Sequence, residues 1–170
     1  MKKKKKNRKG SILPVVAAAL VVIALIVVFA SPKKGGGAAD SLEGELTEDG
    51  ELLIRADSLS ADQVSFIQVP GDSRIELVAR LGDDGTAKVA LGTCQSCNGS
   101  PGAYYTQEGD ELVCNNCGLT FPLTVLDSPG GGCHPIMLDE QVLNTQDADV
   151  LVDTDALSAY ESLFASVAEH

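Results

Sequence analysis

The chain has 170 residues, enough for one modest domain with accessory segments, which excludes a large multidomain enzyme. Aromatic residues make up 4% of the sequence and include no Trp, so neither an aromatic-lined pocket nor a base-stacking platform for nucleic acid is expected. The formal net charge is -11, but seven of the thirteen basic residues lie before Gly10, and residues 1–30 contain no acidic residue. From Ser31 onward, six basic and twenty-four acidic residues give -18, a charge that repels nucleic acid and attracts cations.

An uncharged stretch of nineteen residues, 12–30, follows a basic segment at 1–11. As a helix it would be about 28 Å long, which matches the hydrocarbon core of a bilayer. A cleavable signal peptide has a shorter apolar region, so we predict that residues 12–30 are retained as a transmembrane anchor. The basic segment predicts a cytoplasmic N-terminus, because positively charged flanks stay inside. We therefore expect a single-pass protein of the cytoplasmic membrane, with everything after Ala30 outside the cytoplasm.

Residues 31–50 contain three consecutive glycines and an acidic stretch without periodicity, and they are predicted to form a flexible linker. From Glu51 the pattern changes to four short runs that favour β-strands, at 52–55, 64–69, 75–80 and 87–91. Turn-forming sequences at 70–72 and 82–85 separate the last three runs, which predicts an antiparallel meander.

Residues 141–170 are predicted to be an acidic C-terminal extension with an amphipathic helix. Thr154 or Asp155 could cap this helix at its N-terminus. The apolar residues that recur at helical spacing are interpreted as core packing rather than as a partner surface: Leu157, Tyr160, Leu163, Phe164 and Val167.

Two CxxC pairs are the strongest indication of a functional site in the sequence: Cys94 with Cys97, and Cys114 with Cys117. The sixteen residues between the pairs fall in the range of zinc-ribbon patterns. A CxxC turn lets two thiolates reach one metal while backbone N–H groups point toward the sulfurs. Two such turns make a tetrahedral four-sulfur site.

The residues around the two pairs suit such a site. Asn98 and Gly118 follow the pairs directly and can take the left-handed conformation that these turns often need. Two β-type runs, 103–106 and 111–113, flank a hydrophilic turn at 107–110, so a hairpin could bring the pairs together.

Several chemistries suit these thiols, and spacing alone leaves them open. Two disulfides, or a zinc ion that only stabilises a small fold, are the structural alternatives, since exported proteins meet oxidants. A redox-active centre is the functional one, because a four-sulfur site suits zinc, a rubredoxin-like iron and a small iron–sulfur cluster alike. A thiol–disulfide exchange protein is a third interpretation, although neither pair opens a helix after a βαβ-type strand.

The fifth cysteine, Cys133, follows three glycines at 130–132 and precedes His134 and Pro135. Adjacent side chains of a regular strand point to opposite faces, so Cys133 and His134 could bind one metal only from an irregular loop, which the glycines would allow. A buried Cys133 beside an exposed His134 is the alternative. Cys133 as a nucleophile is another, but the only other histidine is His170 and no acid–base set supports an enzyme. We therefore predict no catalytic residue.

In their order along the chain, these motifs resemble the FtrD-like membrane iron–sulfur proteins, a bacterial and archaeal family. The resemblance covers about residues 50–140. The matching residues are Asp84-Gly85-Thr86, Cys94, Cys97, Tyr104-Tyr105, Gly109-Asp110, Cys114, Cys117-Gly118, Phe121-Pro122, Gly131-Gly132-Cys133 and Pro135-Ile136. The sequence departs from the family pattern at His134, where Asn is expected, and at Val64–Ile67, where relatives have a His-Phe-Tyr-like run that would offer an outer ligand.

The resemblance implies a membrane-tethered domain with an iron–sulfur or other metal centre, associated with iron uptake through a ferric permease. The predicted fold is mainly β: a small antiparallel domain at 51–140 with a zinc-ribbon or rubredoxin-like CxxC hairpin. One transmembrane helix precedes this domain and a short C-terminal helix follows it.

The predicted function is that of an extracytoplasmic metal-binding or electron-transfer component of metal uptake, rather than a stand-alone enzyme. The expected cofactor is an iron–sulfur cluster or iron, with zinc as the alternative. The expected partners are metal ions and a metal permease or membrane redox partner. A structural zinc-ribbon module that docks a membrane partner is the alternative function. The expected ligands are Cys94, Cys97, Cys114 and Cys117, with Cys133 as an additional or exchangeable ligand and His134 as a weaker one.

Overall fold

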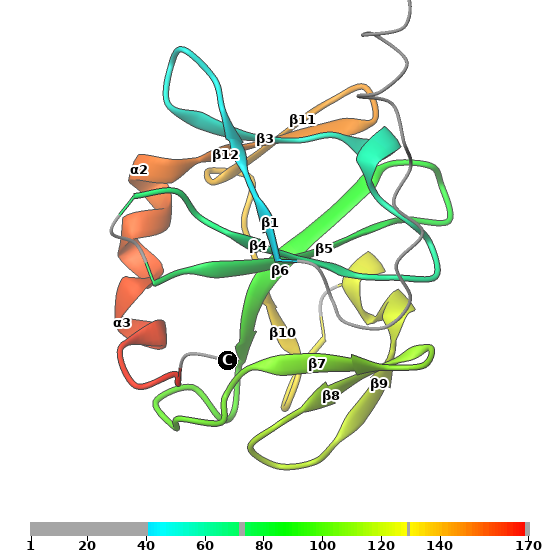
Figure 1. The fold of residues 1–170 in the computed structure, drawn as a ribbon, viewed down its shortest axis with the longest axis vertical. Coiled ribbons are helices and arrows are strands. Elements are labelled where there is room, and N and C mark those ends of the chain that lie inside the picture. Colours follow the sequence, from blue (N-terminus) through cyan, green and yellow to red (C-terminus); the bar gives the residue numbers. More distant parts are fainter. Residues whose placement is uncertain (1–40, 72–73, 129, 169–170) are drawn as a thin grey trace, which may run out of the picture. The chain divides into compact units, whose positions relative to one another are not determined.

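The computed structural model describes residues 41–71, 74–128 and 130–168, which are drawn in colour in Figure 1. The predicted basic tail, the predicted membrane anchor at 12–30 and the first part of the predicted linker lie outside the described residues. Among the described residues, no helix is both long enough and apolar enough to cross a bilayer.

The central element is a five-stranded sheet in the order β1–β4–β5–β6–β10. Its strands are β1 (Ser41–Glu43), β4 (Ser65–Gln68), β5 (Glu76–Leu81), β6 (Ala87–Cys94) and β10 (Pro135–Met137). β4, β5 and β6 follow one another as antiparallel neighbours, which confirms the meander that the turn sequences predicted. β10 is also antiparallel to β6, whereas β1 is parallel to β4.

A second, antiparallel sheet has the order β11–β12–β3–β2 and lies above the central sheet in Figure 1. Its strands are β2 (Glu45–Leu46), β3 (Glu51–Ile54), β11 (Leu143–Gln146) and β12 (Asp149–Asp153).

The strands extend past two predicted boundaries of the β-domain, the one at residue 51 and the one at residue 140. Part of the predicted linker forms β1 and β2, and part of the predicted C-terminal extension forms β11 and β12. These strands have two to five residues, too few to show alternation, and their pairing is long-range, as between Ile54 and Val150.

The third sheet carries the second cysteine pair and has the order β7–β8–β9. Its strands are β7 (Tyr105–Glu108), β8 (Glu111–Cys114) and β9 (Thr120–Pro122). β7 and β8 pair around Gly109 and Asp110, which confirms the predicted hairpin. Two short 3-10 helices complete the connections, η1 (Ala56–Ser58) and η2 (Leu123–Asp127).

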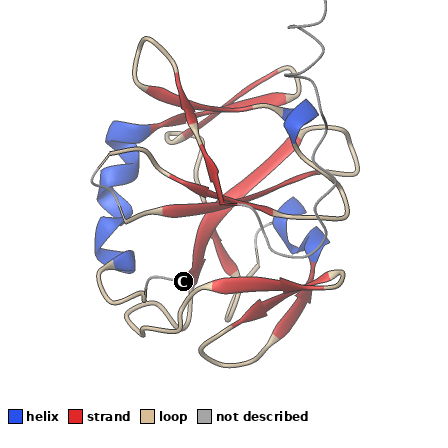
Figure 2. Cartoon of the chain, viewed as in Figure 1, coloured by secondary structure: helices blue, strands red, loops and turns tan. Residues whose placement is uncertain are grey.

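The C-terminal helical segment consists of α2 (Thr154–Leu157), η3 (Ser158–Tyr160) and α3 (Glu161–Phe164), and Figure 2 shows it along one side of the sheets. Its N-cap is Asp153 rather than Thr154 or Asp155, because the Asp153 carboxylate accepts a hydrogen bond from the backbone N–H of Ala156 at 3.0 Å. Leu157 and Phe164 are buried in the core. The interpretation of the apolar stripe as core packing is therefore confirmed.

Two hydrophobic cores lie on opposite faces of the central sheet. Leu77 and Leu91 belong to the first core, whereas their neighbours Val78 and Ala90 belong to the second, as the alternation of strand side chains requires. The first core includes residues of β3, β12 and the C-terminal helices, and the second includes residues of β7, β8 and η2. β6 is buried along most of its length, and its last residue, Cys94, therefore ends inside the second core.

A buried arginine joins the central sheet to η2. Arg80 on β5 is 2% exposed, and its guanidinium donates to both carboxylate oxygens of Asp127 at 2.9 and 3.0 Å. It also donates to Asp83 at 2.9 Å. Asp127 ends η2, so this ion pair holds the chain at the point from which it continues to Cys133.

Candidate metal centre

The first CxxC turn starts where β6 ends. Cys94 is the last residue of the strand, and its carbonyl oxygen accepts hydrogen bonds from the N–H groups of Cys97 at 3.2 Å and Asn98 at 2.8 Å. The left-handed residue of this turn is Gly99, with a φ of 88°, and not Asn98 as predicted. A glycine takes this conformation without the steric cost that a Cβ atom brings, so the left-handed residue comes one position later than expected.

The second CxxC turn repeats the design of the first. Cys114 is the last residue of β8, and its carbonyl oxygen accepts a hydrogen bond from the N–H of Gly118 at 2.8 Å, the same four-residue step as in the first turn. Gly118 has a φ of 71°, as predicted. The N–H of Cys114 donates to the carbonyl of Leu119 at 2.9 Å, which closes the turn on the side of β9.

Tyr104 and Tyr105 hold the two turns against each other. Tyr104 forms a β-bridge with Thr93, the residue before the first pair, and its carbonyl accepts from the N–H of Asn115 at 3.0 Å. Tyr105 pairs with Cys114 across β7 and β8 and is completely buried. The hairpin between the pairs therefore brings the two CxxC turns together, as predicted.

The loop before β10 brings the fifth cysteine to the same place. Pro135 pairs with Cys94 in the central sheet, and the carbonyl of His134 accepts from the N–H of Gln95 at 2.8 Å. The hydroxyl of Tyr105 donates to the carbonyl of Cys133 at 3.2 Å. Cys133 is therefore fixed beside both CxxC turns by long-range contacts that no local pattern contains.

All five cysteines are free thiols, and their sulfurs meet in two groups of three. Within each group every sulfur lies within 4.8 Å of the other two. The inner group, as we call it, contains Cys94, Cys97 and Cys114, all buried, and the outer group contains Cys97, Cys117 and Cys133. Cys117 is exposed and Cys133 is partly exposed, so one group is closed to solvent and the other faces it.

Backbone N–H groups point at the sulfurs, as predicted for CxxC turns. Burial by itself raises the pKa of the Cys94 thiol, but hydrogen bonds from the Tyr105 hydroxyl and from the N–H groups of Cys97 and Ser96 bring that pKa below its ordinary value. The N–H of Leu119 likewise lowers the pKa of Cys117. Each group of three thus contains one sulfur whose surroundings favour the thiolate.

The other cysteines are harder to ionise without a metal. Burial raises the pKa of the Cys114 thiol to about 12. The hydrogen bond shared with Cys117, together with burial, raises the pKa of Cys133 to about 12 as well. A cation that replaces the thiol protons would remove this penalty, because metal ligands bind as thiolates.

The segments that carry the cysteines contain no Lys or Arg. Residues 89–107, 112–126 and 128–138 contain neither Lys nor Arg, and they contain no Asp or Glu either. These segments therefore supply no Lys or Arg to balance thiolate charge. Hydrogen bonds to the sulfurs, from backbone N–H groups and from the Tyr105 hydroxyl, and a bound cation can balance it.

His134 does not join the cluster of sulfurs. Neither group of potential metal ligands among the described residues contains a histidine. The His134 ring packs against Phe121, with ring centroids 5.6 Å apart, and a Cβ atom added at Gly130 would overlap it. Nδ1 of His134 is buried without a hydrogen-bond partner among the described residues. The role of His134 as a ligand stays a prediction, and His170 lies outside the described residues.

The thiols fit a metal such as iron or zinc. Both metals bind thiolates, with metal–sulfur bonds of about 2.3 Å for zinc, which places neighbouring sulfurs of a tetrahedron about 3.8 Å apart. The sulfur separations in each group are compatible with that edge. The convergence of free thiols favours metal binding over the alternative of two disulfides.

Two polar contacts of the cluster were not predicted from the sequence. The Tyr105 hydroxyl contacts Cys94, and the Asn116 side chain contacts Cys97. Tyr105 belongs to the Tyr-Tyr pair of the family pattern, which is a signal for its importance. Asn116 gives no such signal, because a polar residue inside a CxxC turn is usual.

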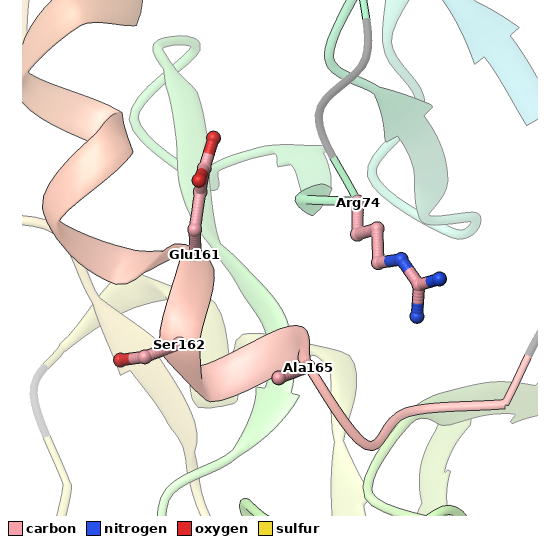
Figure 3. A pocket seen from close by; sticks show the side chains of 4 residues that line it. All are labelled: Arg74, Glu161, Ser162 and Ala165. Atoms are coloured by element: carbon pink, nitrogen blue, oxygen red, sulfur yellow. The ribbon is translucent and has the colours of Figure 1, made fainter.

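A pocket of about 530 Å³ lies elsewhere, between the start of β5 and α3 (Figure 3). It is lined by Arg74, Glu161, Ser162 and Ala165. Figure 3 shows Arg74 and Glu161 pointing in different directions and Ser162 pointing away from Arg74. The pocket therefore offers no converging set of polar groups, and the cysteine cluster is the stronger site.

Fold and site together define a small, mainly antiparallel β protein with a short C-terminal helix and a thiol cluster suited to a metal. The chain belongs to the family described as membrane iron–sulfur containing protein, FtrD-like, whose family model matches residues 59–164. The match confirms the resemblance found in the sequence and extends beyond residue 140, over β11 and β12. Comparisons with curated proteins and with solved structures each found no match.

Proposed function

We propose that the chain is a membrane-anchored, extracytoplasmic metal-binding protein that transfers electrons or otherwise assists metal uptake, with iron as the favoured metal. The observation that carries the proposal is the meeting of five free thiols from three separate stretches of chain in one cluster. Membership in a family of membrane iron–sulfur proteins supports iron as the metal. Iron uptake and a metal permease as partner rest on the family resemblance.

The chain's own residues give the centre its properties. An iron–thiolate or iron–sulfur group, when bound, supplies one-electron chemistry at a potential set by burial and by hydrogen bonds to the sulfurs. The N–H groups of Ser96, Cys97 and Leu119 stabilise negative charge on the sulfurs. The second core excludes water from Cys94 and Cys114, whereas exposed Cys117 offers an edge at which a redox partner can approach.

Purification of the full chain in detergent, without oxygen, tests this function. We expect bound iron, a coloured thiolate spectrum that bleaches on reduction or oxidation, and acid-labile sulfide if the group is a cluster. A protein that binds no metal contradicts the proposal. A colourless protein with stoichiometric zinc contradicts the redox role alone.

A structural zinc site is the second candidate function. It is favoured by the position of Cys94, Cys97 and Cys114 in the second core, where a metal would join the central sheet to β7 and β8. Because structural metal sites supply folding free energy, Cys94→Ser should lower metal content and raise protease sensitivity under both candidates. Thr120→Ala, an exposed change on β9, is the control that should alter neither.

The topology of the anchor has its own test. A reporter that is active only outside the cytoplasm should give signal when fused after His170 and none when fused before Ile12. The opposite pattern would remove the extracytoplasmic placement, and the metal-binding proposal would stand without it.

A further inference from the structure

The grouping of the sulfurs differs from what two CxxC pairs predict. A single tetrahedral ion held by both pairs would bring Cys94, Cys97, Cys114 and Cys117 into one group of four. In the structure the sulfurs instead form the inner and the outer group, each of three, and Cys97 belongs to both. Among the described residues, no set of four sulfurs lies mutually within 4.8 Å.

The position of Cys97 explains this grouping. Its thiol contacts the thiols of Cys94, Cys114 and Cys117. Cys117 in turn contacts Cys133, which completes the outer group. Contacts of Cys133 with Cys94 and of Cys117 with Cys114 also link the two groups, but Cys97 is the sulfur that belongs to both. A thiolate has several lone pairs and can bind two metal ions at once, so a sulfur shared by two groups of ligands has the position of a bridging ligand.

We propose that the five cysteines hold two metal ions, with the Cys97 thiolate as the bridge between them. The inner ion is bound by Cys94, Cys97 and Cys114, and the outer ion by Cys97, Cys117 and Cys133. This inference rests on the proposed metal-binding function and adds the number of ions and the role of each cysteine. It also accounts for Cys133, which a mononuclear four-sulfur site would leave unused.

The charge of the cluster agrees with two ions. Five thiolates carry -5, and no Lys or Arg lies in the three segments that carry them. Two divalent ions reduce the charge to -1, whereas one divalent ion would leave -3, or -2 with the fifth thiol protonated. Charge in a partly buried site is unfavourable unless it is balanced, so the arrangement with two ions is the better compensated one.

Burial gives the two ions different properties. The three sulfurs of the inner group are buried, so the inner ion is closed to solvent. Cys117 is exposed and Cys133 is partly exposed, so the outer ion faces the solvent and can accept a further ligand. The outer ion is therefore the one that exchanges, and the inner ion is the one that stabilises the fold.

Cobalt titration of the full chain tests the number of ions and the bridge. The protein is stripped of metal, reduced with a reductant that lacks thiols and titrated with Co²⁺ in detergent without oxygen. We expect two Co²⁺ per chain with thiolate charge-transfer absorption. The electron paramagnetic resonance signal should grow with the first equivalent and fall with the second, because a thiolate bridge couples the two spins.

Three cysteine variants and one control assign the ligands. Cys133→Ser should bind one Co²⁺ instead of two and lose the coupling, while the control Thr120→Ala should keep two coupled ions. Cys94→Ser should lose the inner ion. Cys97→Ser should abolish the coupling whatever number of ions it retains.

Cadmium provides a test that needs no variant and so does not depend on how a variant folds. The ¹¹³Cd spectrum of the unaltered chain should contain two thiolate-bound resonances, of which one exchanges faster with a competing chelator. A single Co²⁺ or Cd²⁺ per chain would overturn the two-ion centre and leave the proposed function intact. Two ions with additive, uncoupled signals would overturn the bridge, and no bound metal would overturn both proposals.

Discussion

The hydroxyl of Tyr105 on β7 donates a hydrogen bond to the carbonyl oxygen of Cys133 at 3.2 Å, and the same hydroxyl contacts the thiol of Cys94. A hydroxyl has one proton, so it can donate to only one of these acceptors at a time. Tyr105 thus joins the hairpin between the CxxC pairs to the loop of the fifth cysteine. It also supports a sulfur of the inner group.

Tyr105→Phe should loosen the Cys133 loop while the ring keeps its place in the second core. Loss of one hydrogen bond to a partly buried acceptor costs about 1 kcal/mol. That corresponds to roughly a five-fold increase in the open population of the loop. Alkylation of the metal-free protein, with the labelled cysteine identified by mass spectrometry, should show faster modification of Cys133. An unchanged rate would mean that Pro135 and β10 hold the loop without Tyr105.

Gly130→Ala should destabilise the same loop from the other side. A Cβ atom at this position would overlap the ring of His134, which would have to leave Phe121. Overpacking of this kind costs about 1 to 3 kcal/mol, measured as a lower denaturant midpoint. Gly131→Ala is the matched control, because a Cβ atom there meets nothing within 4 Å. Equal stability of the two variants would show that the His134 ring moves aside without cost.

Asp127→Ala should leave the buried guanidinium of Arg80 without its bidentate partner. Arg80 is 2% exposed, and removal of one partner of such a pair costs about 3 kcal/mol. Asp83→Ala removes the other carboxylate from the same arginine, but Asp83 is largely exposed, so that loss should stay below about 1 kcal/mol. Urea unfolding of both variants measures the difference. A larger effect at Asp83 would contradict the role given to η2.

Asp84→Asn should change how stability depends on pH. The side chain of Lys88 and the hydroxyl and N–H of Thr86 donate to the Asp84 carboxylate, and they hold its pKa below the ordinary value of 3.8. A lowered folded-state pKa gives stability that is present above pH 3.8 and is lost as the pH falls toward the folded-state pKa. The wild type should therefore exceed the variant by a constant amount near neutral pH, and the gap should narrow as the pH falls below about 4. Denaturant midpoints measured between pH 3 and 7 test this, and a gap as large at pH 3 as at pH 7 would contradict it.

Local features of the sequence were enough for the meander and the CxxC turns. β4, β5 and β6 are joined by turn-forming sequences, so their pairing depends on neighbours in the chain. The hairpin of β7 and β8 follows for the same reason. The left-handed residue of the second turn is Gly118, as predicted. In the first turn it is Gly99 instead of the adjacent Asn98, because glycine takes this conformation without a steric clash of a Cβ atom.

The domain boundaries could not be predicted in the same way. β1, β2, β11 and β12 are short strands whose hydrogen bonds go to distant segments. Their residues were predicted to belong to the linker and to the acidic C-terminal extension. A strand of two to five residues is too short to show a recognisable alternation of apolar and polar residues. What makes them strands is backbone pairing with β4, with β3 and with each other, which joins segments far apart in the sequence.

The amino-acid sequence by itself determined the family, the two CxxC turns and the supply of five thiols to one domain, because these depend on residue type and spacing. Only the tertiary structure decided which sulfurs meet. Cys133 joins Cys97 and Cys117 because β10 pairs with β6 and Tyr105 reaches the loop, whereas His134 packs on Phe121. Such contacts arise from the packing of segments distant in sequence, and spacing along the chain does not specify them.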